Sequence, residues 1–316
     1  MPELPDIVVY IEALERRVLG ERVTGFRIAS PAVMRTYEPP YDSVVGEEVV
    51  SIQRVGKRIA LGFGDNREGG RPSSDPPPAL RAGEPETVYL VIHLMIAGRL
   101  RWETPRKPIP KKVGLAALDF EAGSLILTEQ GTHKRAGIWM ASSWDEVANL
   151  DRGGIEPLDA NQDEFASALR SENRTLKRAL TDPRIFSGIG NAYSDEILWM
   201  ARLSPVQRTG QLDDEEVGRL HHAVVTSLRE WTERLREEVG EGWPGKVTAF
   251  REDMAVHGKY GEPCPRCGSK VQRIVYSSNE TNYCATCQTG GKLLADRSLS
   301  RLLKDDWPRT LEELEG

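Results

Sequence analysis

Short apolar or alternating runs, separated by glycine and proline, dominate residues 43–63 and 87–140. Runs of this length predict β-strands, and a series of them is typical of a β-sandwich or barrel. The clearest strand candidates are Val49–Gln53, Arg58–Phe63, Val88–Leu94 and Ser124–Thr128. The polar, proline-rich stretch from Gly64 to Glu86 interrupts the series, so we expect a surface loop there.

Helical periodicity flanks this strand-rich region. Between Asp6 and Leu19, apolar residues recur at three- and four-residue intervals, and Gly20 closes the pattern. After Pro157 the chain becomes helical in character, with candidate helices at 163–170, 174–182, 192–201 and 213–239. The last candidate begins with acidic residues, which suit the positive end of a helix dipole.

All four cysteines lie in one short segment, as two C-x2-C pairs separated by 16 residues. This spacing favours a site in which four thiolates bind one Zn2+, with a β-hairpin between the pairs. Disulfides would need an oxidising compartment, and two pairs at this distance favour a metal over a redox-active C-x-x-C motif. Because both pairs are needed to close a tetrahedron, we expect a structural zinc site with no open position. The expected ligands are Cys264, Cys267, Cys284 and Cys287.

These elements predict an α+β protein with three domains. An N-terminal β-sandwich spans residues 1–150, a helical domain spans 151–245, and a C-terminal module with the four-cysteine zinc-finger β-hairpin spans 246–316. A chain of 316 residues is long enough for two or three domains of ordinary size.

The composition is that of an ordinary globular protein. Hydrophobic residues make up 39% and charged residues 28%, with a formal net charge of −6, which excludes a disordered chain. No run of about 18 apolar residues is present, so we expect no membrane span. Glu3 and Asp6 stand where a signal peptide would carry basic residues, so we expect a cytoplasmic protein.

Charge is unevenly distributed along the chain. Basic residues outnumber acidic ones by six to three in 173–208 and by ten to five in 246–304, whereas acidic residues outnumber basic ones by nine to four in 210–241. Two basic segments therefore flank an acidic helix that can face away from a polyanion. A pattern of solvated charges would look the same.

The sequence begins Met-Pro-Glu-Leu-Pro and carries a candidate nucleophile at Pro2. Methionine before proline is normally removed, which leaves a terminal amine with a pKa of about 7.7–8.0 that can attack an electrophilic carbon. Glu3 beside it can move protons. The alternative is a proline that merely starts the chain. Lys57, at the entry to an apolar strand, is a candidate phosphate ligand or simply a solvated strand end.

A Gly-x-Gly turn at residues 188–190 leads from one predicted helix into the next. Glycines permit a tight turn, and the amides at the start of the following helix suit a DNA phosphate. Asn191 and Tyr193 lie at that start, and Lys177 precedes the turn. An ordinary turn between two helices is the competing interpretation.

Taken together, five motifs in this order resemble the formamidopyrimidine-DNA glycosylase and endonuclease VIII family of base-excision repair enzymes. The motifs are Pro2-Glu-Leu-Pro5, Gly56-Lys57, His93-Leu94 with Gly98, Ser187-Gly-Ile-Gly-Asn-Ala-Tyr193, and Gly261-Glu-Pro-Cys264. The resemblance spans nearly the whole chain. It implies a helix–two-turn–helix domain between the β-sandwich and the zinc finger.

The resemblance also implies roles for individual residues. Pro2 would attack C1′ of a damaged, flipped-out nucleotide and form a Schiff base, Glu3 would donate and accept protons, and Lys57 would bind phosphate and assist elimination. The implied activities are those of a DNA glycosylase and an abasic-site lyase. The partner would be damaged double-stranded DNA, bound by a monomer and placing the protein at the nucleoid. DNA contacts are expected from Asn191, Tyr193, Lys177, His93 and Arg135.

Three segments depart from the family pattern. The void-filling loop, usually His-Leu-Gly-Met, reads His-Leu-Met-Ile at 93–96, and the wedge loop, usually Arg-Arg-Phe-Gly, reads Thr-His-Lys-Arg-Ala at 132–136. The finger position usually held by arginine is Asn279, which cannot make the charged, multidentate phosphate contact of arginine. Cations of an added C-terminal tail are candidate substitutes: Lys292, Arg297, Arg301 and Lys304.

Two alternatives therefore stay open. One is a protein that binds damaged DNA or an unusual DNA structure and has lost base excision through the loop and finger changes. The other uses the N-terminal proline as a general base on a small molecule, as tautomerases do. The zinc module, the phosphate turn and the chain length argue against the second alternative.

Overall fold

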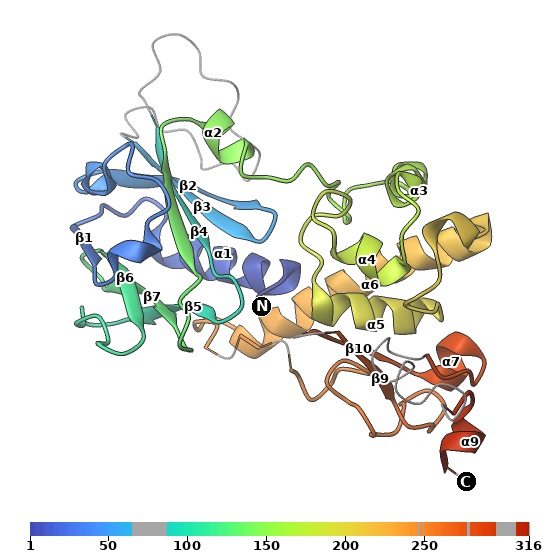
Figure 1. Cartoon of the computed structure of the whole chain (residues 1–316). Coiled ribbons are helices and arrows are strands. Elements are labelled where there is room, and N and C mark those ends of the chain that lie inside the picture. The colour runs from blue at the N-terminus through green and yellow to red at the C-terminus, as the bar shows by residue number, and fades with distance from the viewer. Residues whose placement is uncertain (65–86, 246, 249, 277–278, 295–307, 316) are drawn as a thin grey trace. The chain divides into compact units, whose positions relative to one another are not determined.

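A computed structural model gives the fold and describes residues 1–64, 87–245, 247–248, 250–276, 279–294 and 308–315 (Figure 1). The loop predicted from Gly64 to Glu86 lies, after its first residue, outside the described residues, as do the tail cations Arg297, Arg301 and Lys304. The chain divides into two compact units. The sandwich unit is Met1–Arg152 with Thr232–Val247, and the helical unit is Gly153–Trp231 with Thr248–Gly316.

Two four-stranded sheets form most of the sandwich unit, and neighbouring strands in each sheet are antiparallel (Figure 1). One sheet has the order β1 (Gly25–Ile28), β6 (Gly114–Asp119), β7 (Ser124–Glu129) and β5 (Gly98–Glu103). The other has the order β2 (Glu48–Val55), β3 (Arg58–Gly64), β4 (Val88–His93) and β8 (Gly137–Ala141).

One apolar core joins the two sheets. Alternate residues of each strand enter it, such as Ile59 and Leu61 from β3 and Leu125 and Leu127 from β7, and all four are at most 3% exposed. Strand β3 reads as a continuous apolar run because its outer face is also buried, in a cluster with the short helix α2 (Trp144–Ala148). The predicted β-sandwich is confirmed.

Helix α1 (Leu4–Val18) carries the amino terminus and buries Tyr10 and Leu14 in the same core. The end of the long helix α6 (Asp214–Val239) belongs to this unit as well, and its Arg236 forms a 2.6 Å ion pair with Glu12 of α1. Just beyond α6, Trp243 packs against Tyr10 with 5.8 Å between ring centroids. The helix that positions the amino terminus is therefore held by the sandwich and by the end of α6.

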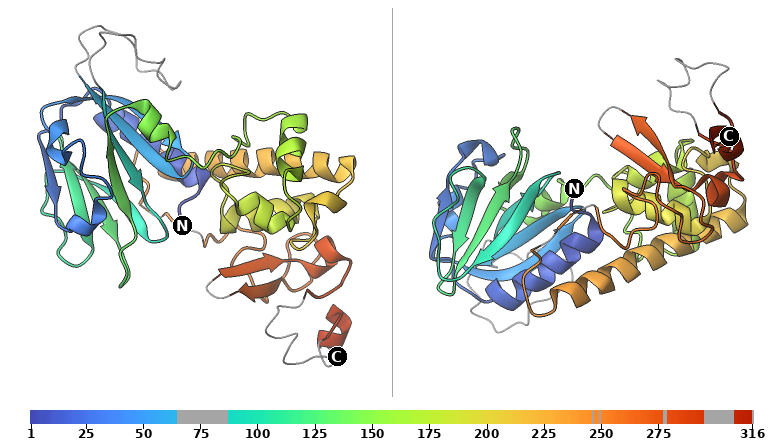
Figure 2. Two further views of the ribbon diagram at one scale, coloured as in Figure 1. Left: turned by 45° about the horizontal axis from the view of Figure 1, so that its top comes forward. Right: turned by 90° about the horizontal axis from the view of Figure 1, so that it is seen from below.

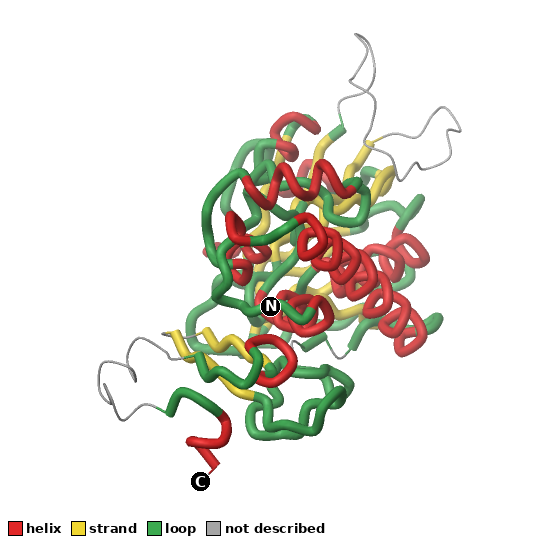
Figure 3. Tube along the Cα trace, turned by 90° about the vertical axis from the view of Figure 1, so that its right-hand side faces the viewer, coloured by secondary structure: helices red, strands yellow, loops and turns green. Residues whose placement is uncertain are grey.

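The helical unit consists of several helices, then the cysteine segment, and then a short helix near its C-terminal end. Its helices are α3 (Gln162–Arg170), α4 (Leu176–Thr181), α5 (Asn191–Ala201) and residues 214–231 of α6. A hairpin of β9 (Gln272–Tyr276) and β10 (Asn279–Tyr283) leads into the short helix α7 (Ala285–Thr289), and α9 (Leu311–Glu315) lies near the end of the chain (Figures 2 and 3). None of the helices in the described part of the chain is long and apolar enough to span a membrane.

The longer predicted helices are confirmed with ends within two residues, and the hairpin between the cysteine pairs is confirmed too. The pattern does not predict β1, α2, α7 or α9, which have four or five residues. A segment of that length is too short to show a periodicity. Strands β5, β6 and β8 lie in the predicted strand-rich region, but they are not predicted individually.

Candidate active site and nucleic-acid interface

Strand register brings three loops to one end of the sandwich unit. Arg58 at the start of β3 pairs with His93 at the end of β4, and His93 pairs with Gly137 at the start of β8. In the other sheet, Gly98 at the start of β5 pairs with Glu129 at the end of β7. The β2–β3 turn, the β4–β5 loop and the β7–β8 loop therefore leave their strands at the same end.

The amino terminus is fixed at the first turn of α1. Pro2 is buried, and Glu3 is 2% exposed. The backbone N–H of Glu3 donates a 2.9 Å hydrogen bond to Oδ2 of Asp6, and the Glu3 carbonyl accepts one of 3.0 Å from the N–H of Ile7. Glu3 is thus the N-cap of α1, and Asp6 closes the turn from three residues away. The backbone of the predicted catalytic pair, Pro2 and Glu3, is held by these bonds.

Charged groups gather around this terminus. Burial lowers the pKa of the terminal amine, that of Met1 in the full chain, below its ordinary value of 8.0, while Glu3 raises it and Arg99 and Lys57 lower it further. The pKa of Lys57 is also lowered, by burial first and against the attraction of Glu3. The amine, Glu3 and Lys57 therefore lie within electrostatic reach of one another. A lowered pKa leaves a larger fraction of the amine unprotonated and nucleophilic at neutral pH.

His93 shapes the β4–β5 loop. Its pKa is lowered to about 4, by burial first and then by Arg58 and Lys57, so the ring is neutral. Nδ1 accepts a 2.9 Å hydrogen bond from the N–H of Met95. Met95 has a left-handed φ of 52°, and the following Ile96 is 58% exposed. The loop therefore presents an apolar side chain to solvent.

One buried carboxylate supports the β7–β8 loop. Glu129, 2% exposed, accepts hydrogen bonds from the N–H groups of Arg135 (2.7 Å) and Ala136 (3.0 Å). From the other side, Nη2 of Arg35 donates a 3.0 Å bond to the Arg135 carbonyl. The side chain of Arg135 itself is exposed. Hydrogen bonds therefore hold the backbone that carries this predicted DNA contact.

In the helical unit, α5 begins at the predicted Gly-x-Gly turn. Gly188 has φ of 77°, in the left-handed region that favours glycine. Asn191 opens the helix, and its Nδ2 donates a 2.9 Å hydrogen bond to the carbonyl oxygen of Glu280 in β10. Tyr193 is 2% exposed and packs edge-on against Trp231, with 5.9 Å between ring centroids. Tyr193 belongs to the core of this unit, so we do not propose the direct DNA contact that was expected for it.

Lys177, in α4, contacts the first residue of α5. Its Nζ donates hydrogen bonds to the carbonyl oxygen of Asn191 and to Oδ1 of Asp195, both at 2.6 Å. Its side chain is 12% exposed, and that of Asp195 is fully buried. Lys177, an expected DNA contact, is therefore engaged within the protein.

Two buried carboxylates of α5 accept hydrogen bonds from the C-terminal part of the unit that contains the finger. Asp195 also accepts hydrogen bonds from Nδ1 of His257 (2.7 Å) and from the N–H of Asn282 (3.2 Å). Glu196 accepts three backbone N–H bonds of 2.8 to 2.9 Å from residues 255–257. Neither residue was predicted from the sequence. The available signal was the adjacent acidic pair on a helix that has no other charged residue.

Three residues at the sandwich end also escaped sequence analysis. Asp6 has a local signal, because an acidic residue three positions after an N-cap is typical of a capping box. Arg99 and Glu129 have none. Their positions near the terminus and under the β7–β8 loop follow from the pairing of β5 with β7, which no local pattern shows.

A groove of about 510 Å3 lies where α4 and the start of α5 meet the finger hairpin. Its lining includes Lys177, Arg178, Arg208 and Asn191 from the helical part and Asn279 from β10. Arg178 and Arg208 are exposed. Cations along a groove suit the phosphates of a nucleic acid.

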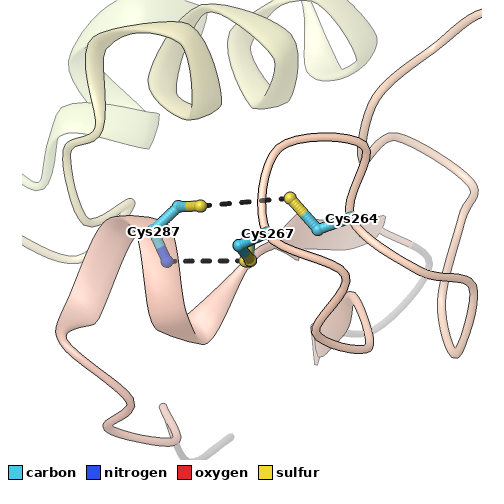
Figure 4. A group of neighbouring side chains, drawn as sticks. Cys264, Cys267 and Cys287 are labelled. Atoms are coloured by element: carbon cyan, nitrogen blue, oxygen red, sulfur yellow. Dashed lines mark hydrogen bonds between the residues drawn. The ribbon is translucent and has the colours of Figure 1, made fainter.

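The four predicted zinc ligands converge on one point. Their sulfur atoms all lie within 4.8 Å of one another, with 3.4 Å between Cys267 and Cys284. The sulfur atoms of Cys264 and Cys287 face each other at 4.0 Å (Figure 4). Four thiolates around one Zn2+ have sulfur atoms about this far apart. Nε1 of Trp199 donates a 3.3 Å bond to Sγ of Cys264, which stabilises a thiolate. This is a structural zinc site, as predicted.

Three family models match the chain. The formamidopyrimidine-DNA glycosylase N-terminal domain matches residues 1–132, the formamidopyrimidine-DNA glycosylase H2TH domain matches 154–239, and the zinc finger found in FPG and IleRS matches 261–290. The H2TH and zinc-finger matches fall on the segments from which the resemblance was inferred.

Individual relatives agree with these matches. An uncharacterized formamidopyrimidine-DNA glycosylase-like protein of Mycobacterium tuberculosis is 40% identical over 151 residues, which are 48% of this chain and 94% of that protein. The formamidopyrimidine-DNA glycosylase of Lactococcus lactis subsp. cremoris is 28% identical over 299 residues, 91% of this chain and 99% of the relative. A crystal structure of wild-type Lactococcus lactis Fpg with DNA containing an oxidised pyrimidine has a TM-score of 0.73 and 25% identity, covering 91% of this chain and all of that one.

Proposed function

Because the chain belongs to the formamidopyrimidine-DNA glycosylase family, we propose that it is a base-excision repair enzyme that is both a DNA glycosylase and an abasic-site lyase. Pro2 is the nucleophile. The observation that carries the proposal is the gathering of the terminal amine, Glu3 and Lys57 at one end of the sandwich unit.

The surroundings of Pro2 support its use as a nucleophile. Removal of Met1 transfers the terminal amine to Pro2, which is buried just before α1. Burial lowers the pKa of a terminal amine at this place, and a neutral amine is the form that attacks carbon. A cation that forms on this nitrogen is stabilised by the adjacent carboxylate of Glu3.

The proposed reaction balances through these groups. The Pro2 nitrogen attacks C1′ and passes its proton to the carboxylate of Glu3, while the base leaves and takes up a proton from water. Glu3 protonates O4′ as the sugar ring opens and the nitrogen forms a C=N+ iminium bond. The iminium draws electrons from the C2′–H bond, Glu3 takes up that proton, and the 3′ phosphate leaves by β-elimination. Water then hydrolyses the iminium and frees Pro2.

We assign the flanking phosphate to Lys57. Its side chain is half-buried in the β2–β3 turn, and burial lowers its pKa. An anionic partner favours the charged form of such a lysine. A phosphate at Lys57 therefore strengthens the charge that assists the departure of the 3′ phosphate.

We propose damaged double-stranded DNA as the substrate, with the target nucleotide flipped out of the stack. Flipping leaves a gap in the duplex, which apolar side chains can fill. Ile96 is exposed on the β4–β5 loop and suits this role, with the loop shaped by His93. Arg135 in the sandwich unit and the groove beside Asn191 in the helical unit supply phosphate contacts.

Borohydride trapping tests the chemistry, because borohydride reduces an iminium to a stable amine. Wild-type protein incubated with a duplex containing an abasic site should form a covalent adduct, and peptide mapping should place it on Pro2. The Pro2→Gly variant should give much less adduct, whereas Lys112→Ala, which removes an exposed lysine of the same unit, should match wild type. No adduct from wild type, an equal adduct from Pro2→Gly, or retention of Met1 in the purified protein overturns the assignment of Pro2.

A second candidate is a damaged-DNA-binding protein without base excision. The changed loop at 93–96, the wedge loop without an aromatic residue and Asn279 in the finger favour it. Tight binding to a duplex with an abasic analogue, together with no release of any oxidised or ring-opened base from a panel of lesions, would select this function over the first.

A further inference from the structure

The basic segment 173–208 holds six basic and three acidic residues, and the structure shows which of its cations are neutralised. Arg174 forms ion pairs with Asp182 and with Glu172, which lies just outside the segment, and Arg184 also pairs with Asp182. Lys177 forms an ion pair of 2.6 Å with Asp195. The third acidic residue, Glu196, is occupied by backbone N–H groups. The net positive charge of the segment therefore resides on the remaining three cations, Arg178, Arg202 and Arg208.

Two of these three arginines line one groove. Arg178 and Arg208 are exposed at the groove of about 510 Å3, and within the described part of the chain neither has a carboxylate partner. Nη1 of Arg208 donates a 3.2 Å bond to the backbone carbonyl of Asn173, which leaves its charge unbalanced. Arg202 lines a different hollow, beside Glu215 and His222.

Backbone pairing brings the two arginine segments together. Thr175 forms an isolated antiparallel bridge with Arg208, and the N–H of Leu176 donates a 2.8 Å bond to the carbonyl oxygen of Gln207. The segment that ends in Arg208 therefore runs beside the start of α4, where Arg178 lies. Arg178 also lines a second hollow of about 630 Å3, so it stands between two depressions of the surface.

Lys177 lines the same groove but differs in two respects. Its side chain is 12% exposed, and its charge is balanced by a fully buried carboxylate at 2.6 Å. Its remaining hydrogen bond holds the carbonyl oxygen of Asn191. A phosphate entering the groove thus meets unbalanced positive charge at the two arginines.

We propose that Arg178 and Arg208 are a phosphate-binding pair for the DNA backbone, and that Lys177 is an internal tie that positions the start of α5. Guanidinium groups suit this task because they offer two N–H donors to phosphate oxygens at once. The identity of the ligand as DNA rests on the proposed function. The different roles of the two arginines and Lys177 rest on their ion pairs and hydrogen bonds.

The salt dependence of duplex binding tests the pair. The probe is a fluorescein-labelled duplex with a tetrahydrofuran abasic analogue, titrated with the full-length protein at several salt concentrations. Each phosphate contact that a substitution removes lowers the slope of log Kd against log salt by about 0.9. Arg178→Ala and Arg208→Ala should each lower the slope by about that amount, and the double variant by about twice as much, with unchanged melting temperatures.

Arg202→Asn is the matched control. It removes the same charge from an exposed arginine without a carboxylate partner among the described residues, and asparagine accepts the left-handed backbone there, whose φ is 58°. Its slope should equal that of wild type. Equal reductions in all three single variants would mean a general charge effect and would overturn the proposal, as would unchanged slopes for both groove arginines.

Lys177→Met tests the internal tie. It should lower the melting temperature and leave the slope of the folded protein unchanged; a reduced slope with an unchanged melting temperature would overturn this half of the proposal. If Lys177→Met does not fold, a tie is supported, and the three arginine variants still decide the phosphate pair. Borohydride adduct formation by wild type is measured separately, so a protein that binds through Arg178 and Arg208 but forms no adduct would refute the proposed activity alone.

Discussion

The backbone N–H of Met95 donates a 2.9 Å hydrogen bond to Nδ1 of His93, across the left-handed turn that follows β4. A nitrogen that accepts a hydrogen bond carries no proton, so the neutral ring is the form that closes this turn. Burial beside Arg58 and Lys57 favours the same form by lowering the pKa of His93 to about 4. The conformation of the loop that carries Ile96 thus depends on a neutral His93.

Acid should destabilise the sandwich unit through His93. Its pKa is about 4 in the folded protein against an ordinary value of 6.5. Above pH 6.5, His93 is neutral in both the folded and the unfolded protein. Between pH 6.5 and 4 the unfolded chain binds a proton at His93 and the folded protein does not. The free energy of unfolding therefore falls as the pH falls toward 4. The full effect is at most about 3 kcal/mol. Urea unfolding of wild type and His93→Asn between pH 7 and 4 measures it. Asparagine keeps an acceptor without titrating, so identical pH dependence in the two proteins would contradict the prediction.

Met95 occupies a backbone conformation that costs most side chains energy. Its φ is 52°, at the position where the family motif has glycine. Met95→Gly should therefore raise the free energy of unfolding by up to about 1 kcal/mol, because glycine relieves the strain. Met95→Val should lower it, because a β-branched residue tolerates this region least. Denaturant unfolding of both variants at neutral pH gives the comparison, and equal stabilities would show that the turn is not strained.

The elements with strong periodicity were predictable, and those set by packing were not. Helix α6 shows its acidic start and apolar spacing along 26 residues, so its bounds could be predicted almost to the residue. Strand β1 has four residues and pairs with β6, which lies about 90 residues away. Nothing in its own sequence separates it from a loop, because the partner supplies its hydrogen bonds.

Some residues of the candidate site could also be predicted from the sequence, and others could not. The cysteine spacing predicted the zinc ligands, because metal geometry restricts ligand spacing. Lys177 and Tyr193 were expected to contact DNA, yet one is neutralised by Asp195 and the other is buried against Trp231. A sequence shows that a residue is basic or aromatic, but its availability depends on partners that the fold brings from elsewhere.

Removal of zinc should unfold the finger and leave the sandwich unit folded. Cys264 and Cys284 are buried in a small apolar cluster with Val256 and Val271, which is too small to be stable without the metal. Cys267→Ser should lower the zinc content well below one ion per chain and abolish tight duplex binding. Zinc content by atomic emission and duplex binding by anisotropy check this. The control is Thr286→Ala, an exposed position between the second pair of cysteines. Retention of tight binding by the zinc-free variant would contradict the prediction.

Asp195 should be among the most sensitive positions of the helical unit. Its buried carboxylate accepts hydrogen bonds from Lys177, His257 and the N–H of Asn282. Asp195→Ala leaves the lysine charge without a partner in a site where it is 12% exposed, so we expect a loss of about 3–5 kcal/mol in the free energy of unfolding.

The matched comparison for Asp195 is Asp214, which pairs with Arg170 at 2.8 Å but has a side chain that is 92% exposed. Water already solvates this second pair, so Asp214→Ala should cost about 0.5 kcal/mol or less. Adding Lys177→Met to Asp195→Ala should recover part of the lost stability, because the double variant has no buried cation to desolvate. Urea unfolding of the four proteins gives both quantities. A cost at Asp195 no larger than that at Asp214, or no recovery in the double variant, would mean that the buried pair does not hold the junction between α5 and the finger.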